Sequence, residues 1–211
     1  LKNSLAVLKK TEALKEGHFI LSSGLHSSIY VQCAKLLSFP NKAEKICKSL
    51  ASKIKKKFKK IDIILAPAMG GIIIGYEIGK ILKVETIFCE RVNGKFKLRR
   101  GFKIKPKSKV LIIEDVITTG KSSLECLKLI KSNKANLLGF ACIIDRSNMK
   151  QLKIKQKIIS QIKLSIPTFN DKNLPNSLKK IPVSLLSYRK YGQELQTFGA
   201  SFEFTRLLNS L

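Results

Sequence analysis

Apolar residues follow two alternating patterns along this chain. Compact apolar runs of the kind that form buried strands occur in four segments, at residues 61–71, 84–91, 110–117 and 135–146. Between them, apolar residues recur at the spacing of a helix face, at residues 40–60, 72–83 and 120–133. Strands that alternate with helices are typical of α/β proteins, so we expect a doubly wound, mostly parallel sheet.

The flanking and connecting segments predict smaller features. Residues 1–16 have the pattern of a short amphipathic helix. Residues 17–33 place β-forming residues on both sides of a Ser/Gly turn, as in a hairpin. Residues 92–102 are polar, cationic and contain glycine, and we expect a loop there.

The length of 211 residues suits one domain. We expect it to cover residues 1–183 and to include a small N-terminal hood at residues 17–35. Residues 184–211 would then be a C-terminal extension of unknown role, since the sequence from Leu185 onward resembles nothing that indicates one.

The net charge of +27 comes from lysines spread along the whole chain, because only six of the 41 basic residues are arginine. Arginine is the residue that usually reads base edges, so this composition favours a solvated cationic surface. A polyanion partner is the alternative. In either case the positive field attracts small phosphorylated anions.

Cysteine usage and hydropathy indicate the compartment. The five cysteines are scattered singly and form no C-x-x-C pair, which is typical of reduced thiols packed in a cytoplasmic protein. No segment approaches the roughly 18 continuous apolar residues of a membrane span. We therefore expect neither a membrane nor a specific nucleic acid as a partner.

Charged and glycine-rich positions follow four of the predicted strands. In open α/β sheets, ligands bind beyond the carboxyl ends of the strands. We therefore expect one site to collect these residues, which are Ala68-Met69-Gly70-Gly71, Arg91, Glu114-Asp115 and Arg146.

The segment "VLIIEDVITTGKSS" (110–123) carries the most specific chemistry. It is not an ATP-binding P-loop, because that motif requires glycine five positions before Gly120, where this chain has Asp115. Backbone N–H groups of residues 117–122, at the start of a helix, can instead bind one phosphate monoester. The hydroxyl groups that would add donors belong to Thr118, Thr119, Ser122 and Ser123.

The two acids, Glu114 and Asp115, would repel that phosphate, so they should face groups that donate hydrogen bonds. A ribose with vicinal hydroxyls, one sugar length from its 5-phosphate, fits this requirement. A hydrated Mg²⁺ that bridges sugar and diphosphate oxygens fits as well. The alternative is that the acids only cap the following helix.

This pattern of apolar residues, two acids, T-T-G and small hydroxyl residues resembles the signature of type I phosphoribosyltransferases. Within that superfamily, "GHFILSSGLHSSIYV" resembles the N-terminal hood of orotate phosphoribosyltransferases. The pair "CER…LRRGF" resembles their mobile loop, and "IIDR" resembles their orotate-binding strand end. The resemblance covers residues 11–183, with four separated motifs in the same order.

The resemblance implies transfer of a 5-phosphoribosyl group from phosphoribosyl diphosphate (PRPP) to orotate, with Mg²⁺ bound through PRPP and water. The implied enzyme is a homodimer whose loop reaches the neighbouring site. The implied catalytic residues are Asp115, Glu114, Arg91, Lys97 and Arg99. The implied PRPP-binding residues are Glu114, Asp115, Val116, Ile117, Thr118, Thr119, Gly120, Lys121, Ser122, Ala68, Met69 and Gly70. The implied orotate-binding residues are Thr118, Arg146, Tyr30 and Ser23.

The sequence departs from the best-known bacterial pattern in three places. Ser22 replaces a lysine of the hood, and the Ala68–Gly71 segment replaces "AYKG". The mobile loop is shorter, which indicates a shorter-loop subgroup. The catalytic cation of that loop stays open among Lys95, Lys97, Arg99 and Arg100.

Two other functions and two histidines stay open. The acceptor could be a purine base, although an arginine at position 146 favours the anionic orotate. A PRPP-sensing regulator that binds nucleic acid would be supported by net charge alone. His18 and His26 are each expected to be structural or exposed.

Overall fold

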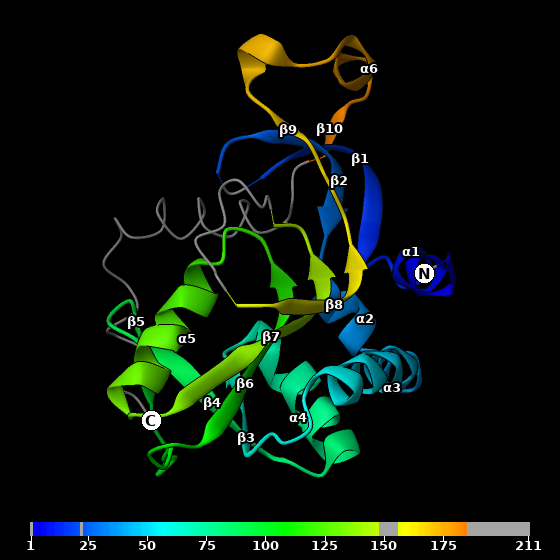
Figure 1. Cartoon of the computed structure of the whole chain (residues 1–211). Helices are drawn as coiled ribbons and strands as arrows, with labels where there is room; N and C mark the ends of the chain where they lie inside the picture. Colours follow the sequence, from blue (N-terminus) through cyan, green and yellow to red (C-terminus); the bar gives the residue numbers. More distant parts are fainter. Residues whose placement is uncertain (1, 22, 148–155, 185–211) are drawn as a thin grey trace, which may run out of the picture. The chain divides into compact units, whose positions relative to one another are not determined.

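The computed structural model describes residues 2–21, 23–147 and 156–184. The chain divides into two compact units (Figure 1). Unit 1 comprises residues 1–15 and 31–165, and unit 2 comprises residues 16–30 and 166–211. The boundary that we expect at residue 183 lies beside the last described residue, and the predicted extension falls almost entirely outside the described residues.

A six-stranded sheet forms the centre of unit 1, with the strand order β5-β4-β3-β6-β7-β8. All neighbouring strands are parallel except the antiparallel pair β4 and β5. The doubly wound, mostly parallel sheet expected from the sequence is therefore confirmed. The strands are β3 (Ile63–Pro67), β4 (Glu85–Val92), β5 (Lys95–Leu98), β6 (Lys109–Ile117), β7 (Asn136–Asp145) and β8 (Ile158–Lys163).

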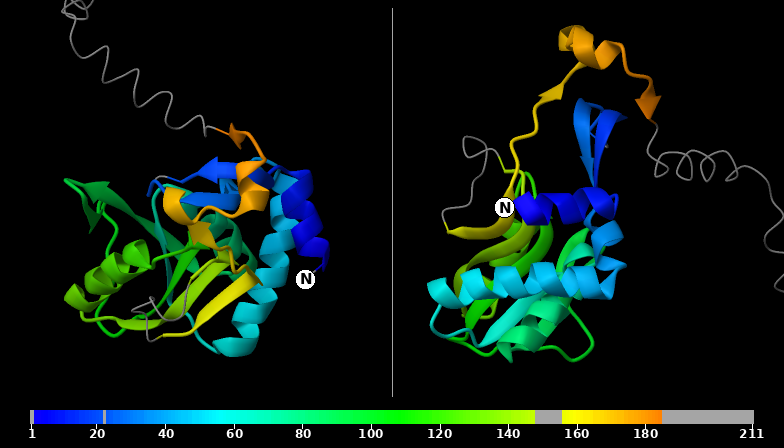
Figure 2. Two further views of the ribbon diagram at one scale, coloured as in Figure 1. Left: turned by 90° about the horizontal axis from the view of Figure 1, so that it is seen from above. Right: turned by 90° about the vertical axis from the view of Figure 1, so that its right-hand side faces the viewer.

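Helices cover both faces of this sheet (Figure 2). Alternate residues of a strand point to opposite faces. Ile63 and Leu65 of β3 therefore share a core cluster with α5, whereas Ile64 and Ala66 face α4. The helices of unit 1 are α1 (Lys2–Lys10), α2 (Cys33–Leu37), α3 (Pro40–Lys57), α4 (Gly70–Leu82) and α5 (Lys121–Ser132).

The polar segment 92–102 is not the simple loop that we expected. It contains β5, which pairs with β4 as a hairpin. Asn93 and Gly94 both have positive φ angles, of 50° and 75°, as a two-residue hairpin turn requires. The alternation in "KFKL" buries Phe96 between two exposed lysines. An Asn-Gly pair followed by alternating residues was the sequence signal that the loop prediction overlooked.

Two further elements differ from expectation. The first helix ends at Lys10, and Leu14 instead begins β1. Strand β8 was not expected, because its sequence "IISQIK" mixes polar and apolar residues after a lysine-rich stretch. Such a mixture suits an edge strand of the sheet, whose environment is only partly apolar.

Unit 2 is built on a four-stranded sheet with the order β10-β1-β2-β9. The hairpin expected at residues 17–33 corresponds to β1 (Leu14–Ile20) and β2 (His26–Val31). Two strands much later in the chain complete the sheet, a pairing that no local pattern predicts. They are β9 (Thr168–Phe169), which pairs with β2, and β10 (Val183–Ser184), which pairs with β1. Between them lie the helical segments η1 (Asp171–Asn173) and α6 (Asn176–Lys179).

A buried chain of side chains links these segments of unit 2. His18 and His26 are only 3% and 6% exposed, and His18 Nε2 lies 2.6 Å from His26 Nδ1. His18 Nδ1 donates to the carbonyl of Ile181 (3.0 Å), and His26 Nε2 lies 2.6 Å from Asp171 Oδ1. The structural interpretation of both histidines therefore fits.

We expect His26→Ala to weaken unit 2 by about 2–3 kcal/mol, because it leaves His18 Nε2 buried without a partner. Asp171→Ala should cost less than about 1 kcal/mol, because the Asp171 side chain is 87% exposed. Hydrogen exchange of the β1 and β2 amides measures both changes. Equal effects of the two substitutions would contradict the importance of the buried contact.

Candidate active site

The carboxyl ends of β4, β3, β6 and β7 lie next to one another at one edge of the unit 1 sheet. The connection through α4 runs from β3 outward to β4, toward one edge strand of the sheet. The connection through α5 runs from β6 outward to β7, toward the opposite edge strand. Right-handed crossovers in opposite directions place their helices on opposite faces. The strand order therefore reverses between β3 and β6, which is the position where sheets of this kind bind their ligands.

Glycines let the start of α4 approach β6 closely. A Cβ on Gly70 would lie 2.6 Å from Asp115 Oδ1, and one on Gly71 would lie 2.8 Å from the carbonyl oxygen of Ile113. The preceding peptide bond, Ala68–Met69, is cis. The predicted diphosphate segment and the second acid therefore share one small space.

The adjacent acids Glu114 and Asp115 point to opposite faces of the sheet. Glu114 is 8% exposed and accepts a short hydrogen bond from the hydroxyl of Ser123, on the first turn of α5. Asp115 packs against Gly70 on the α4 side, where the N–H of Val116 donates to its Oδ1 (2.8 Å). The sequence suggested two acids that act side by side, whereas the strand's two-residue period separates them.

Burial makes both acids harder to ionise. Desolvation raises the pKa of Glu114 to about 7, against the lowering effect of the Ser123 hydrogen bond. Desolvation also raises the pKa of Asp115, opposed by the N–H of Val116. Glu114 is consequently divided between its neutral and charged forms near neutral pH, so it can accept or donate a hydrogen bond.

The turn after β6 has the form of an anion-binding helix start. Gly120 is the N-cap residue of α5 and has a left-handed φ of 72°. Glycine offers no side chain to cap the first turn, and the N–H of Lys121 donates to Thr119 Oγ1 (3.4 Å). Thr118 and Thr119 are exposed, whereas Ser123 is fully buried. Ser123 therefore does not join the other hydroxyls as a phosphate donor, contrary to our expectation.

Most cations of the β4–β5 hairpin are paired with acids. Arg91 donates to Glu125 Oε2 on α5 (2.7 Å) and stacks over Phe96. Arg99 and Arg100 both pair with Glu90. Lys95 and Lys97 are exposed on β5, and within the described part of the chain neither has an acidic partner.

Arg146 directly follows β7, and its backbone N–H donates to the carbonyl of Ile117 (2.8 Å). Burial lowers the pKa of its guanidinium. Its Nε is buried and has no hydrogen-bond partner among the described residues. The other predicted orotate contacts, Tyr30 and Ser23, belong to unit 2, so their place in the site stays a prediction.

Sequence reasoning missed three side chains that organise these residues. They are Ser123, which binds Glu114, and Glu125 and Glu90, which bind the hairpin arginines. No local signal identifies Ser123 or Glu125, because their partners come from other strands. Glu90 stands opposite Lys97 across the hairpin. Recognition of the Asn-Gly turn would therefore have indicated that Glu90 lies among the hairpin cations.

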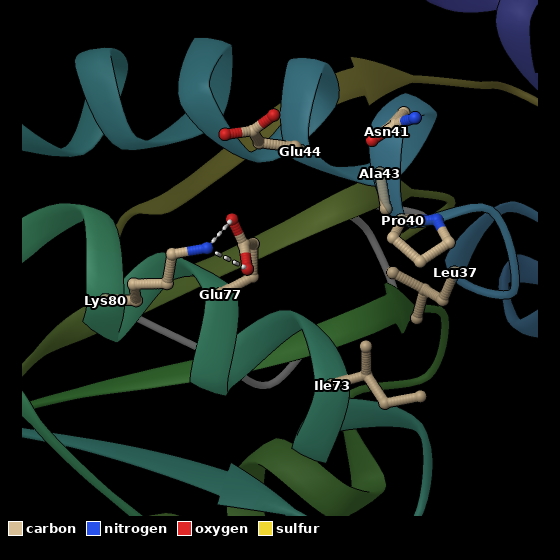
Figure 3. A pocket seen from close by; sticks show the side chains of 8 residues that line it. All are labelled: Leu37, Pro40, Asn41, Ala43, Glu44, Ile73, Glu77 and Lys80. Atoms are coloured by element: carbon tan, nitrogen blue, oxygen red, sulfur yellow. Dashed lines mark hydrogen bonds and ion pairs between the residues drawn. The ribbon is translucent and has the colours of Figure 1, made fainter.

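A separate pocket of about 260 Å³ lies between α3 and α4 in unit 1 (Figure 3). None of the predicted site residues lines it. The lining residues are Leu37, Pro40, Asn41, Ala43, Glu44, Ile73, Glu77 and Lys80.

Comparison with known proteins identifies the class. Residues 38–172, more than half of the chain, match the phosphoribosyl transferase domain, so the chain belongs to that family. Orotate phosphoribosyltransferase of Erythrobacter litoralis is 40% identical over 85% of this chain and 93% of its own length. The enzyme of the same name from Caulobacter vibrioides is 43% identical over 81% of this chain and 88% of its own length. Within the family, the chain therefore belongs to the orotate phosphoribosyltransferases, as its motifs indicated.

Solved structures confirm the fold. Orotate phosphoribosyltransferase from Aeropyrum pernix matches with a TM-score of 0.63 and 23% identity, over 75% of this chain and 92% of its own. Adenine phosphoribosyltransferase from Saccharomyces cerevisiae matches with a TM-score of 0.61 and 18% identity, over 75% of this chain and 99% of its own. The same fold thus carries different acceptor bases.

The raised pKa of Glu114 predicts a pH-dependent cost to stability. The folded state holds the Glu114 proton up to a pH of about 7, whereas the unfolded chain releases it near 4.5. The wild-type protein therefore loses stability relative to Glu114→Gln as the pH rises through this window. We expect the variant to be about 3 kcal/mol more stable above pH 7 and equal to wild type below pH 4.5, measured by urea denaturation.

Glu12→Gln is the matched control. Lys15 lowers the pKa of exposed Glu12, so its removal should bring no gain at high pH. A Glu114→Gln advantage that did not change with pH would contradict the burial of an ionisable carboxylate.

Proposed function

We propose that this chain transfers the 5-phosphoribosyl group of PRPP to orotate, giving orotidine 5′-monophosphate and diphosphate in UMP biosynthesis. The observation that carries the proposal is the continuous segment in which buried Glu114 and half-buried Asp115 of β6 lead into the first turn of α5, whose N-cap residue is glycine. The acids could bind a sugar diol, and the N–H groups could bind a phosphate. The two sets follow each other along the segment, as the hydroxyls and the 5-phosphate do along one ribose.

The PRPP site would use residues on both sides of the reversal in strand order. The N–H groups of residues 116–122 would bind the 5-phosphate, with hydroxyls from Thr118, Thr119 and Ser122. Glu114 and Asp115 would hold the ribose hydroxyls from opposite sides. Ala68, Met69 and Gly70, at the start of α4, would meet the diphosphate, which the helix N-terminus favours electrostatically.

The reaction needs stabilisation of charge and no protein nucleophile. As the bond from the anomeric carbon to diphosphate breaks, the sugar becomes oxocarbenium-like and the leaving group gains negative charge. Preorganised charges serve such a transition state best. Lys97 and Lys95 are the hairpin cations without an acidic partner in the described structure, so we assign the leaving group to Lys97 first. Arg91 and Arg99, which are paired with acids, would help to orient the substrate.

Mg²⁺ would accompany PRPP and add positive charge at the diphosphate. Among the described residues, no group of three His, Cys, Asp or Glu side chains is placed to hold a metal ion. The acids at 114 and 115 face opposite directions and do not form a chelating pair. We propose that substrate oxygens and water would hold the metal.

Orotate would bind through Arg146. Its buried Nε lacks a partner in the described structure, and a carboxylate can satisfy a guanidinium with two parallel hydrogen bonds. A purine offers no such anion. Thr118 would reach the base from the phosphate turn, and Tyr30 and Ser23 would contribute from unit 2.

The direct test is an absorbance assay of orotate consumption with PRPP and Mg²⁺, run beside adenine as acceptor. Wild-type protein should consume orotate and leave adenine unchanged. Asp115→Asn should remain folded and lower kcat/KM by about 100- to 1,000-fold, equivalent to about 3–4 kcal/mol of transition-state stabilisation. Consumption of adenine in place of orotate would overturn the proposed acceptor.

Arg146→Ala should raise the KM for orotate at least tenfold and leave the KM for PRPP nearly unchanged. The physical reason is the loss of one charge-assisted pair to the orotate carboxylate, about 1.5–3 kcal/mol. Steady-state kinetics with each substrate varied in turn measures the split. Parallel increases in both constants would place Arg146 outside the orotate site.

We also propose that two copies associate through α4. Exposed apolar side chains at Met69 (83%), Ile73 (55%) and Tyr76 (67%) recur at the spacing of one helix face, and Ile73 lines the pocket of Figure 3. Glu44 and Glu77 line that pocket in a chain with only 14 acids against 41 basic residues. The same face of a second copy would supply the matching apolar surface.

Light scattering should give the mass of a dimer for wild type, and Tyr76→Glu should shift it toward the monomer, because it buries a charge in the contact. Ile181→Glu, at an exposed apolar residue of unit 2, is the control. If the hairpin of one copy serves the site of the other, mixing Asp115→Asn with Lys97→Ala should restore activity. A monomeric wild type would contradict the proposed contact.

A cytoplasmic location is a further proposal. All five cysteines are free and buried, as in proteins of reducing compartments. Within the described residues, no helix has the length and apolar character to cross a membrane.

A further inference from the structure

Ser123 and Glu114 form a buried contact between a helix and a strand. Ser123 lies on the first turn of α5 and is 0% exposed, and its hydroxyl donates to Glu114 Oε1 of β6. A serine within a helix commonly bonds back to its own helix or to solvent. Here the hydroxyl donates to the side chain of Glu114 on strand β6 instead of to the backbone of its own helix.

The two partners belong to different parts of the proposed PRPP site. Glu114 would hold the ribose, and the turn that carries Ser123 would hold the 5-phosphate. The hydrogen bond therefore fixes the separation between the ribose and phosphate contacts. Positioning of this kind affects rate strongly, because small displacements from the reactive geometry are costly.

Ser123 is also the neutral donor that favours the charged form of Glu114. Desolvation and Asp115 raise the pKa of Glu114, whereas Ser123 and Arg91 lower it. The thiols of Cys126 and Cys142 also interact with it. The hydrogen bond with Cys89 and burial raise the pKa of Cys126, and burial raises the pKa of Cys142, so both thiols remain neutral. Arg91 is shared with Glu125, which leaves Ser123 as the closest supporting contact.

We propose that Ser123 is a positioning residue, whose hydroxyl orients the Glu114 carboxylate toward the ribose and holds it at a fixed distance from the phosphate-binding turn. The inference rests on the proposed PRPP site and assigns Ser123 no contact with substrate. It predicts that loss of the hydroxyl weakens PRPP binding and leaves orotate binding unchanged.

The experiment combines calorimetric PRPP binding across pH with a ¹³C NMR titration of the Glu114 carboxyl. Ser123→Ala should weaken PRPP binding about tenfold near pH 7, the effect of one lost hydrogen bond to a charged group. It should also move the Glu114 titration upward by about one pH unit. The ionisation of PRPP is the same in experiments with wild type and with Ser123→Ala. The difference between the two proteins in PRPP binding across pH therefore reports on Glu114.

Two further variants separate positioning from packing. Ser123→Thr keeps the hydroxyl and should restore the titration and most of the affinity. Ser132→Ala removes a serine at the other end of α5 that bonds to the carbonyl of Leu129, and it should change neither measurement. Circular dichroism confirms that each variant is folded.

The outcomes distinguish the two proposals. Failure of the wild-type protein to bind PRPP would overturn the proposed function and this inference with it. Binding by wild type that is equal in Ser123→Ala, or weakened without any shift of the Glu114 titration, would overturn the role of Ser123 alone.

Discussion

The burial of two carboxylates at the end of β6 is the constraint on which the rest of the site depends. An acid removed from water loses solvation that only charges, dipoles or hydrogen bonds can replace. The fold meets this requirement by directing each acid to the start of a different helix, Glu114 to α5 and Asp115 to α4. The reversal of strand order between β3 and β6 makes this arrangement possible, because it brings both helix starts to the same edge of the sheet.

Charge in this chain is specific near the site and diffuse elsewhere. The excess of lysine makes the surface positive everywhere, which accelerates encounter with anionic substrates without selecting among them. Near the hairpin, in contrast, Glu90 and Glu125 hold three arginines in defined positions. Selection among anions must therefore come from placed groups such as Arg146, and not from the net charge.

Local patterns in the sequence were sufficient for the four central strands of the unit 1 sheet. Apolar runs predicted β3, β4, β6 and β7, and polar residues after these runs predicted the edge where we propose that ligands bind. Both inferences rest on neighbouring residues, because burial of a strand leaves a continuous apolar run. The hairpin strand β5 was also readable from Asn93-Gly94 and was overlooked. The mixed sequence of β8 was not readable, because an edge strand has no such run.

The sequence by itself determined that two acids, a turn that begins a helix and an arginine occupy the ends of parallel strands. Only the tertiary structure decided that Glu114 and Asp115 face opposite sides and that Ser123 bonds to an acid. It also decided that hydrogen bonds of His18 and His26 join strands β1 and β2 to Ile181 and Asp171 of unit 2. These facts depend on contacts between residues far apart in the chain. The physical reason is that periodicity records which face of an element is buried, whereas hydrogen-bond partners are set by how separate elements pack.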